Sequence, residues 1–180
     1  MRYPMNGFTL IELMVTLVVT AIVLSIAIPS FQSQMLNNRS IALGEDFASA
    51  INFARIEAVK RAGRVSLCAS KDGETCSGSW NEGFIAFVDT VAADTTETPV
   101  VGTVLRAWKK QDSSAVISVK NGSDDKTFIR YTGLGTLARL TDKPFVISAQ
   151  FKKCTGSAAR QINIGLSGSV SVSRIACATE

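Results

Sequence analysis

The stretch that decides the fold lies close to the N-terminus and reads Gly7-Phe8-Thr9-Leu10-Ile11-Glu12-Leu13. It opens an apolar run from Phe8 to Ile28 in which Glu12 is the only charged residue. About 20 apolar residues are enough to cross a bilayer as one helix. We therefore expect residues 8–28 to form a transmembrane helix.

Glu12 is costly in such a segment. A carboxylate at the bilayer centre raises the free energy of insertion by about 2.5–3.5 kcal/mol, and by somewhat less nearer the interface. A partner that compensates this charge is therefore expected.

The leader before the apolar run is also unusual. The leader is very short, residues 1–7, and Arg2 is its only charged residue. An ordinary secretory signal carries its small-residue cleavage site after the apolar core, whereas Gly7 comes before it. A plain single-span anchor with one stray acid would leave both Gly7 and Glu12 unexplained.

Residues 7–13 resemble the N-terminus of type IV pilins and pseudopilins. The resemblance implies that the prepilin peptidase cuts between Gly7 and Phe8 on the cytoplasmic face. It also implies that Phe8 is then N-methylated, and that Glu12 is the glutamate this family carries near its mature N-terminus. Residues 1–7 would be a cleaved leader peptide.

Charge pairing gives Glu12 a role in assembly. One helical turn does not place the Phe8 amine ideally for its own Glu12. In a bundle of such helices, the amine of one subunit can meet the carboxylate of its neighbour. A desolvated pair is favourable only when both members are present. Glu12 is therefore expected to set the axial register between subunits.

Composition limits the alternatives. The chain has 180 residues, a formal net charge of +4 and no histidine, so one domain plus an anchor is expected. Histidine is the commonest general base and metal ligand, and nothing singles out a lysine in its place. Gly133-x-Gly135 is too short for a dinucleotide fingerprint. We expect no enzyme activity and no cofactor.

Four cysteines, Cys68, Cys76, Cys154 and Cys177, follow the apolar run. An even number fits disulfides in an oxidising compartment such as the periplasm. Three pairings are open, of which the local one, Cys68–Cys76 with Cys154–Cys177, is favoured. A metal site is not expected, because neither pair has the short spacing of a zinc knuckle.

The helix is expected to continue beyond the membrane. Pro29 predicts a kink or local break near residues 25–29. Residues 29–62 then form an amphipathic half that ends near Arg61, with Gly63 as the stop. Its apolar stripe is Leu43, Phe47, Ala50, Ile51, Ala54 and Ala58.

Residues 63–180 change to the pattern of short strands and turns. Strands are predicted at 64–69, 80–89, 100–108, 115–120, 127–131, 145–151, 161–165 and 169–175. Residues 121–125 predict a hairpin between the fourth and fifth of these, and 92–99 an exposed loop. The fold class is α+β, with a mostly antiparallel sheet packed on the stripe of the long helix.

The head narrows the resemblance. One stretch of the head is similar to minor pilins of the FimU and FimT type and to type II secretion pseudopilin H, most of all to FimU. The stretch consists of Cys68, then Asp72-Gly73-x-x-Cys76, then Trp80-x-x-Gly83-Phe84-Ile85-x-Phe87-x-Asp89. The resemblance implies a minor pilin that joins other major and minor pilins and helps to prime a type IV pilus or form its tip. A type II secretion pseudopilin is the alternative.

Arginine placement predicts the topology. Arg2 precedes the apolar run, and no Lys or Arg follows until Arg39. The positive-inside rule then leaves the leader in the cytoplasm and the head in the periplasm. The protein is expected in the inner membrane, and in the filament after assembly.

DNA is a further partner to consider. FimT-type proteins take up DNA through a C-terminal Gly-Arg-x-Arg motif, but the matching stretch here is Gly168-Ser169-Val170-Ser171. Phosphate contacts need Lys or Arg, so DNA binding is not favoured. A basic patch would form only if four side chains converge, namely Lys152, Lys153, Arg160 and Arg174.

Replacing Gly7 with serine or a bulkier residue should leave the leader attached, because the peptidase cuts after the glycine. Intact-mass measurement should then show a protein heavier by residues 1–7 than the unaltered protein, which should begin at Phe8. A native protein that begins at Met1 would contradict the cleavage.

Overall fold

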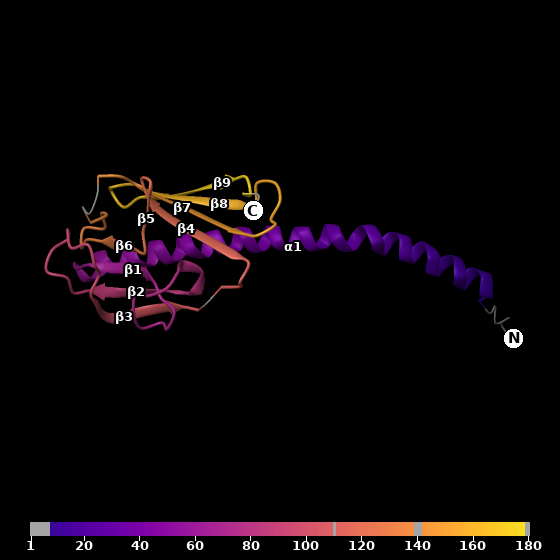
Figure 1. Ribbon diagram of the computed structural model, residues 1–180, viewed down its shortest axis with the longest axis horizontal. Coiled ribbons are helices and arrows are strands. Elements are labelled where there is room, and N and C mark those ends of the chain that lie inside the picture. The colour runs from indigo at the N-terminus through magenta and orange to yellow at the C-terminus, as the bar shows by residue number, and fades with distance from the viewer. Residues whose placement is uncertain (1–7, 110, 139–141, 179–180) are drawn as a thin grey trace, which may run out of the picture. The chain divides into compact units, whose positions relative to one another are not determined.

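The computed structural model describes residues 8–109, 111–138 and 142–178. One long helix, α1 (Leu10–Arg61), is followed by short antiparallel strands and a 3-10 turn, η1 (Trp80–Glu82) (Figure 1). The α+β prediction is therefore confirmed. The chain divides into two compact units between Met35 and Leu36. The strands are β1 (Val65–Ala69), β2 (Phe84–Asp89), β3 (Val101–Trp108), β4 (Ala115–Asn121), β5 (Asp124–Asp125), β6 (Phe128–Tyr131), β7 (Phe145–Phe151), β8 (Ala159–Ile164) and β9 (Val170–Ile175).

The first unit contains the N-terminal part of α1. Its apolar side chains from Phe8 to Ile28 are all exposed, and by length and composition α1 could cross a membrane. The helix runs through Pro29 without interruption. The prediction of a local break near Pro29 was therefore wrong, because loss of one N–H donor does not end a helix whose neighbouring turns remain hydrogen-bonded. The kink at Pro29 stays a prediction.

The second unit is built on the C-terminal part of α1. All six residues of the predicted stripe are buried in one core with side chains from both sheets. The helix ends at Arg61, where the N–H of Gly63 bonds the carbonyl of Ala58. Ala62, rather than Gly63, takes the left-handed conformation at φ 47°.

The strands form two sheets rather than the expected single one. The first has the order β3-β2-β1-β6 and the second β5-β4-β7-β8-β9. The predicted hairpin after β4 is real but joins β4 to β5, through Gly122 at φ 64°. β6 pairs instead with β1 in the other sheet. It is buried along its whole length, so it fits the interior next to β1 better than a solvated hairpin.

The aromatic strand predicted from Trp80 begins later. Trp80 lies in η1, and β2 starts at Phe84 after Gly83, which has φ 129°. The Trp80 indole packs edge-on against Phe47 of α1 at 5.3 Å between ring centroids. Its N–H donates to the carbonyl of Lys126 over 2.8 Å. Anchoring of this indole at both ends explains why a turn replaces the strand.

The four cysteines form two disulfides, Cys68–Cys76 and Cys154–Cys177. This is the local pairing. The first closes the loop between β1 and η1. The second ties the end of the described chain to the β7–β8 turn, where the N–H of Cys177 also bonds the carbonyl of Gly156.

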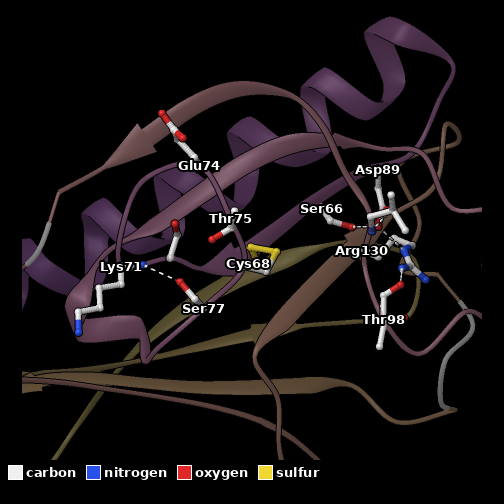
Figure 2. The surroundings of a disulfide bond; sticks show 12 residues. Ser66, Cys68, Lys71, Glu74, Thr75, Ser77, Asp89, Thr98 and Arg130 are labelled. Atoms are coloured by element: carbon white, nitrogen blue, oxygen red, sulfur yellow. Dashed lines mark hydrogen bonds and ion pairs between the residues drawn. A yellow bond between two sulfur atoms is a disulfide. The ribbon is translucent and has the colours of Figure 1, made fainter.

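A buried ion pair lies inside the first sheet, and the sequence did not indicate it. Arg130 Nε on β6 contacts Asp89 Oδ2 on β2 over 2.8 Å, and both side chains are fully buried. The Ser66 hydroxyl on β1 donates to the same carboxylate oxygen over 2.6 Å. Figure 2 shows these three side chains converging from three neighbouring strands.

The same arginine organises the 92–99 loop. Its guanidinium donates to the carbonyls of Asp94 over 3.0 Å, Thr96 over 2.6 Å and Thr98 over 3.4 Å. Asp89 in turn accepts from the N–H of Val100 over 3.0 Å. The loop is mostly exposed, as predicted, but three of its backbone carbonyls accept hydrogen bonds from the buried Arg130 guanidinium.

Replacing Arg130 with methionine should lower the free energy of unfolding by about 3–5 kcal/mol, because Asp89 is left buried without its counter-charge. Arg174→Met, the same change at an exposed arginine of β9, should alter it by about 0.5 kcal/mol or less. Tryptophan fluorescence measures this in the detergent-solubilised chain, since Trp80 and Trp108 both belong to the head. A loss below about 1 kcal/mol for Arg130→Met would contradict the role of the pair.

Candidate assembly interface

The start of α1 is fixed by Thr9. Its side-chain oxygen accepts the N–H of Glu12 over 3.3 Å, and its carbonyl accepts the N–H of Leu13 over 3.2 Å. A threonine in this place satisfies N–H groups that have no partner within the helix. Glu12 therefore lies in the first turn, where the helix dipole also favours a negative charge.

Hydroxyl groups along the apolar part of α1 are satisfied within the helix. Thr16, Thr20 and Ser25 donate to carbonyls three or four residues earlier, over 2.7–2.8 Å. Such back-bonding removes their need for water. The Glu12 side chain is exposed and forms no ion pair or hydrogen bond with any residue of 8–109, 111–138 and 142–178. It is the group in this segment that still needs a partner.

Two more residues belong to the predicted N-terminal site, Gly7 and Phe8. Gly7 lies outside the described residues. Phe8 is the first described residue, and its side chain is 77% exposed. Cleavage and N-methylation at these positions stay predictions. Neither the leader nor the peptidase is needed to explain the geometry of Thr9 and Glu12.

The proposed basic patch does not form from all four of its members. Lys152 and Lys153 are exposed at the turn after β7, and Arg174 is exposed on β9. Arg160 pairs with Arg174 in strand register, but its side chain is buried and its Nε contacts Glu45 Oε1 over 3.2 Å. A buried arginine that is paired with an acid is poorly placed to reach a phosphate, so the structure does not favour Arg160 as a DNA contact.

Gly44 explains this burial. A Cβ atom at Gly44 would lie 2.3 Å from the Arg160 Cβ. Glycine within a helix costs about 1 kcal/mol relative to alanine, and here it opens the space that the Arg160 stem occupies. Glycine inside the amphipathic pattern was the one sequence signal that α1 approaches another element closely at this point.

Titratable groups of the head are perturbed for structural reasons. The hydroxyl and N–H of Thr75 donate to Asp72 and hold its pKa well below the usual range. Burial raises the pKa of the Tyr131 hydroxyl. Within the described ranges, no three His, Cys, Asp or Glu side chains gather closely enough to hold a metal ion.

Two separate parts of the chain, one at the N-terminus and one in the head, match known protein families. Residues 4–28 match the prokaryotic N-terminal methylation motif. Residues 43–168 match the family described as type II transport protein GspH, which covers well over half of the chain.

The chain belongs to the GspH family.

Solved structures agree with this GspH-family fold. Two crystal forms of the type IV minor pilin FimU from Pseudomonas aeruginosa strain PAO1 superpose with a TM-score of 0.54 each. Their sequences are 19% and 17% identical to that of this chain. The superposition includes 76% and 73% of this chain, and 89% and 90% of the two FimU chains. A search of curated proteins finds no match.

The GspH-family protein is thus a member of the pilin and pseudopilin group, and its fold is like that of FimU. These families imply assembly with other pilins and processing by the prepilin peptidase. The apolar helix fits anchoring in the inner membrane. The candidate functional surface is therefore an assembly interface that includes Phe8 and Glu12.

Binding of DNA by the detergent-solubilised protein should be weak in a mobility-shift assay, because Arg160 is neutralised and the Gly168–Ser171 stretch has no arginine. Arg174→Ala should change the affinity little. Tight binding that falls steeply with salt and weakens in Arg174→Ala would overturn this expectation.

Proposed function

We propose that this protein is a low-copy minor pilin, incorporated into a type IV pilus through its N-terminal helix and helping to prime assembly or to form the tip complex. The observation that carries the assembly part of the proposal is Glu12, whose exposed carboxylate in the first turn of an apolar helix has no partner among residues 8–109, 111–138 and 142–178. The likeness of the fold to the minor pilin FimU favours the type IV pilus. In this proposal the head lies in the periplasm and its role is assembly rather than catalysis.

Charge pairing drives the proposed assembly. Cleavage after Gly7 creates a positive amine at Phe8, within one helical turn of Glu12. In the low dielectric of the membrane or the filament core, a carboxylate and an amine attract each other far more strongly than in water. A subunit that brings its amine to the Glu12 of a neighbour satisfies both charges and fixes the axial offset between the two helices.

Aliphatic packing supplies the remaining stabilisation. Side chains from Leu10 to Ile28 are exposed in the isolated chain. When the helix leaves lipid, these side chains need another apolar environment. A bundle of similar helices supplies it, and the hydroxyls of Thr16, Thr20 and Ser25, already bonded within α1, do not oppose it.

A secretion pseudopilin is the second candidate, favoured by the match of residues 43–168 to a type II transport family. Pseudopilins would use the same N-terminal pairing, so Glu12 does not separate the two. Crosslinking in intact cells, followed by identification of the neighbouring subunits, does. Pilus subunits as neighbours support the first candidate, and secretion-system subunits support the second.

Glu12→Ala should leave membrane insertion intact, because it removes a charge from the apolar segment, but should strongly reduce the amount of protein in sheared filaments. Removing one member of a desolvated pair costs about 3–5 kcal/mol. Asp46→Ala, at an exposed acid farther along α1, is the matched control. Equal incorporation of Glu12→Ala and Asp46→Ala would remove the register argument.

A further inference from the structure

The second sheet ends in an open edge strand, β9 (Val170–Ile175) (Figure 1). β9 pairs with β8 along its whole length without a register shift, and it contains no proline and no acid. Its side chains from Ser171 to Arg174 are all exposed, although they point alternately to the two faces of the sheet. The strand therefore contributes little to the core, and its outer backbone groups pair with no strand of the described residues.

The other described sheet edges are closed in ways that proteins commonly use. β3 pairs with β2 through two register shifts, which bend the strand and increase its twist. β5 has only two residues, and both are aspartates. The outer side of β6 is covered by the chain itself, since the N–H of Ala138 bonds the carbonyl of Arg130. Among the described edges, β9 alone is both long and regular.

Contacts at both ends hold this open edge in place. At its start, the carbonyl of Ser169 accepts the N–H of Gly165 over 2.9 Å. At its end, the Cys154–Cys177 disulfide joins the chain to the β7–β8 turn, and the N–H of Cys177 donates to the carbonyl of Gly156 over 2.9 Å. An edge that is ordered beforehand loses less conformational freedom when a partner pairs with it.

The same end contacts show which backbone groups face outward. Bonded and non-bonded residues alternate along an antiparallel ladder. Ser169 and Cys177 both bond inward, so the odd-numbered residues of β9 bond β8. The N–H and carbonyl groups of Val170, Val172 and Arg174 are left to face the open edge. A row of alternating donors and acceptors at this spacing fits another extended chain.

Charge selects among the strands that could be added. Residues 143–178, which include β7, β8 and β9, contain Lys and Arg but no Asp or Glu. Arg160 is paired with Glu45 of α1. Arg174 lies opposite Arg160 in register and forms no ion pair or hydrogen bond with the described residues, and Glu180, the one acid that follows it, lies outside them. An acid on an added strand would satisfy the Arg174 guanidinium.

We infer that β9 receives an extended strand from the head of another pilin subunit, with an Asp or Glu of that strand beside Arg174, an inference that rests on the proposed assembly function. The second sheet then continues across the interface. Main-chain hydrogen bonds supply the affinity in such strand addition, and side chains supply the selectivity. A filament brings the heads of neighbouring subunits together, so these heads are the nearest source of an extended strand.

Other occupants fit the edge less well. In a second copy of this chain, β9 has no acid to place beside Arg174, and the acidic edge β5 has only two residues. A nucleic acid could place a phosphate on Arg174, but it would leave the outward carbonyls of β9 without donors. An added strand satisfies both the backbone row and the guanidinium.

Photocrosslinking in intact cells tests the inference with the full chain. A benzophenone-bearing amino acid replaces Val172, which is 39% exposed on β9, or, as the matched control, Thr103, which is exposed on the register-shifted edge β3. Mass spectrometry should find the Val172 probe joined to a strand peptide from the head of another pilin, and the Thr103 probe not joined to it. Crosslinks from Val172 only to a second copy, to nucleic acid or to lipid, or none at all, would overturn the inference.

Substitution at the edge supplies a second measurement. Val172→Pro removes an outward N–H but no hydrogen bond to β8, a change that edge strands tolerate. It should reduce the protein in sheared filaments about fivefold, the factor that corresponds to one hydrogen bond. Val172→Thr, which keeps the N–H and the β-branched shape, should not. Intact disulfides and tryptophan fluorescence report folding, and the crosslink decides if Val172→Pro does not fold.

Charge reversal tests the selectivity of the same edge. Arg174→Glu should also reduce incorporation, because it would face the acid of the added strand, whereas Arg174→Lys should retain most of it. Normal entry of folded Val172→Pro or of Arg174→Glu into filaments would overturn this inference and leave the proposed function standing. If the unaltered chain never enters filaments, the proposed function fails as well.

Discussion

One helix in this protein has to satisfy two different surroundings. From Leu10 to Ile28, α1 exposes aliphatic side chains on every face, which only lipid or other apolar helices can cover. From Leu43 to Ala58, the same helix buries one stripe in the core of the head. Since α1 is continuous through Pro29, the membrane or filament segment and the folded head belong to one element. Every other feature of the chain depends on this division.

Charge is used in opposite ways in the two units. In the head, the buried charges Asp89 and Arg130 are satisfied within the molecule, by each other and by backbone groups of the 92–99 loop. In the apolar segment, Glu12 has no such partner among the described residues. A buried charge that is paired within the molecule is tolerated by the fold, whereas a desolvated charge without a partner requires another molecule. This contrast is the physical basis for reading Glu12 as an assembly residue.

Close backbone contacts shape the surface of the head. Gly44 admits the stem of Arg160, and Gly133, Gly135 and Gly168 let two turns pack on the end of α1. These contacts remove Arg160 from the surface and leave Leu134 on it. Arg160 therefore does not join Lys152, Lys153 and Arg174 in a basic patch, and the Leu134 side chain is 86% exposed.

The sequence by itself determined the N-terminal motif, the length of α1, its buried stripe and most of the strands, because these depend on local spacing and periodicity. Local spacing also favoured the disulfide pairing that the structure contains. Only the tertiary structure decided that β6 leaves β4 for β1, that Trp80 forms a turn, and that Asp89 meets Arg130. Those outcomes depend on contacts between residues far apart in the chain. The periodicity and spacing of a single sequence do not show which buried strands become neighbours. They also do not show which side chain packs against a given glycine.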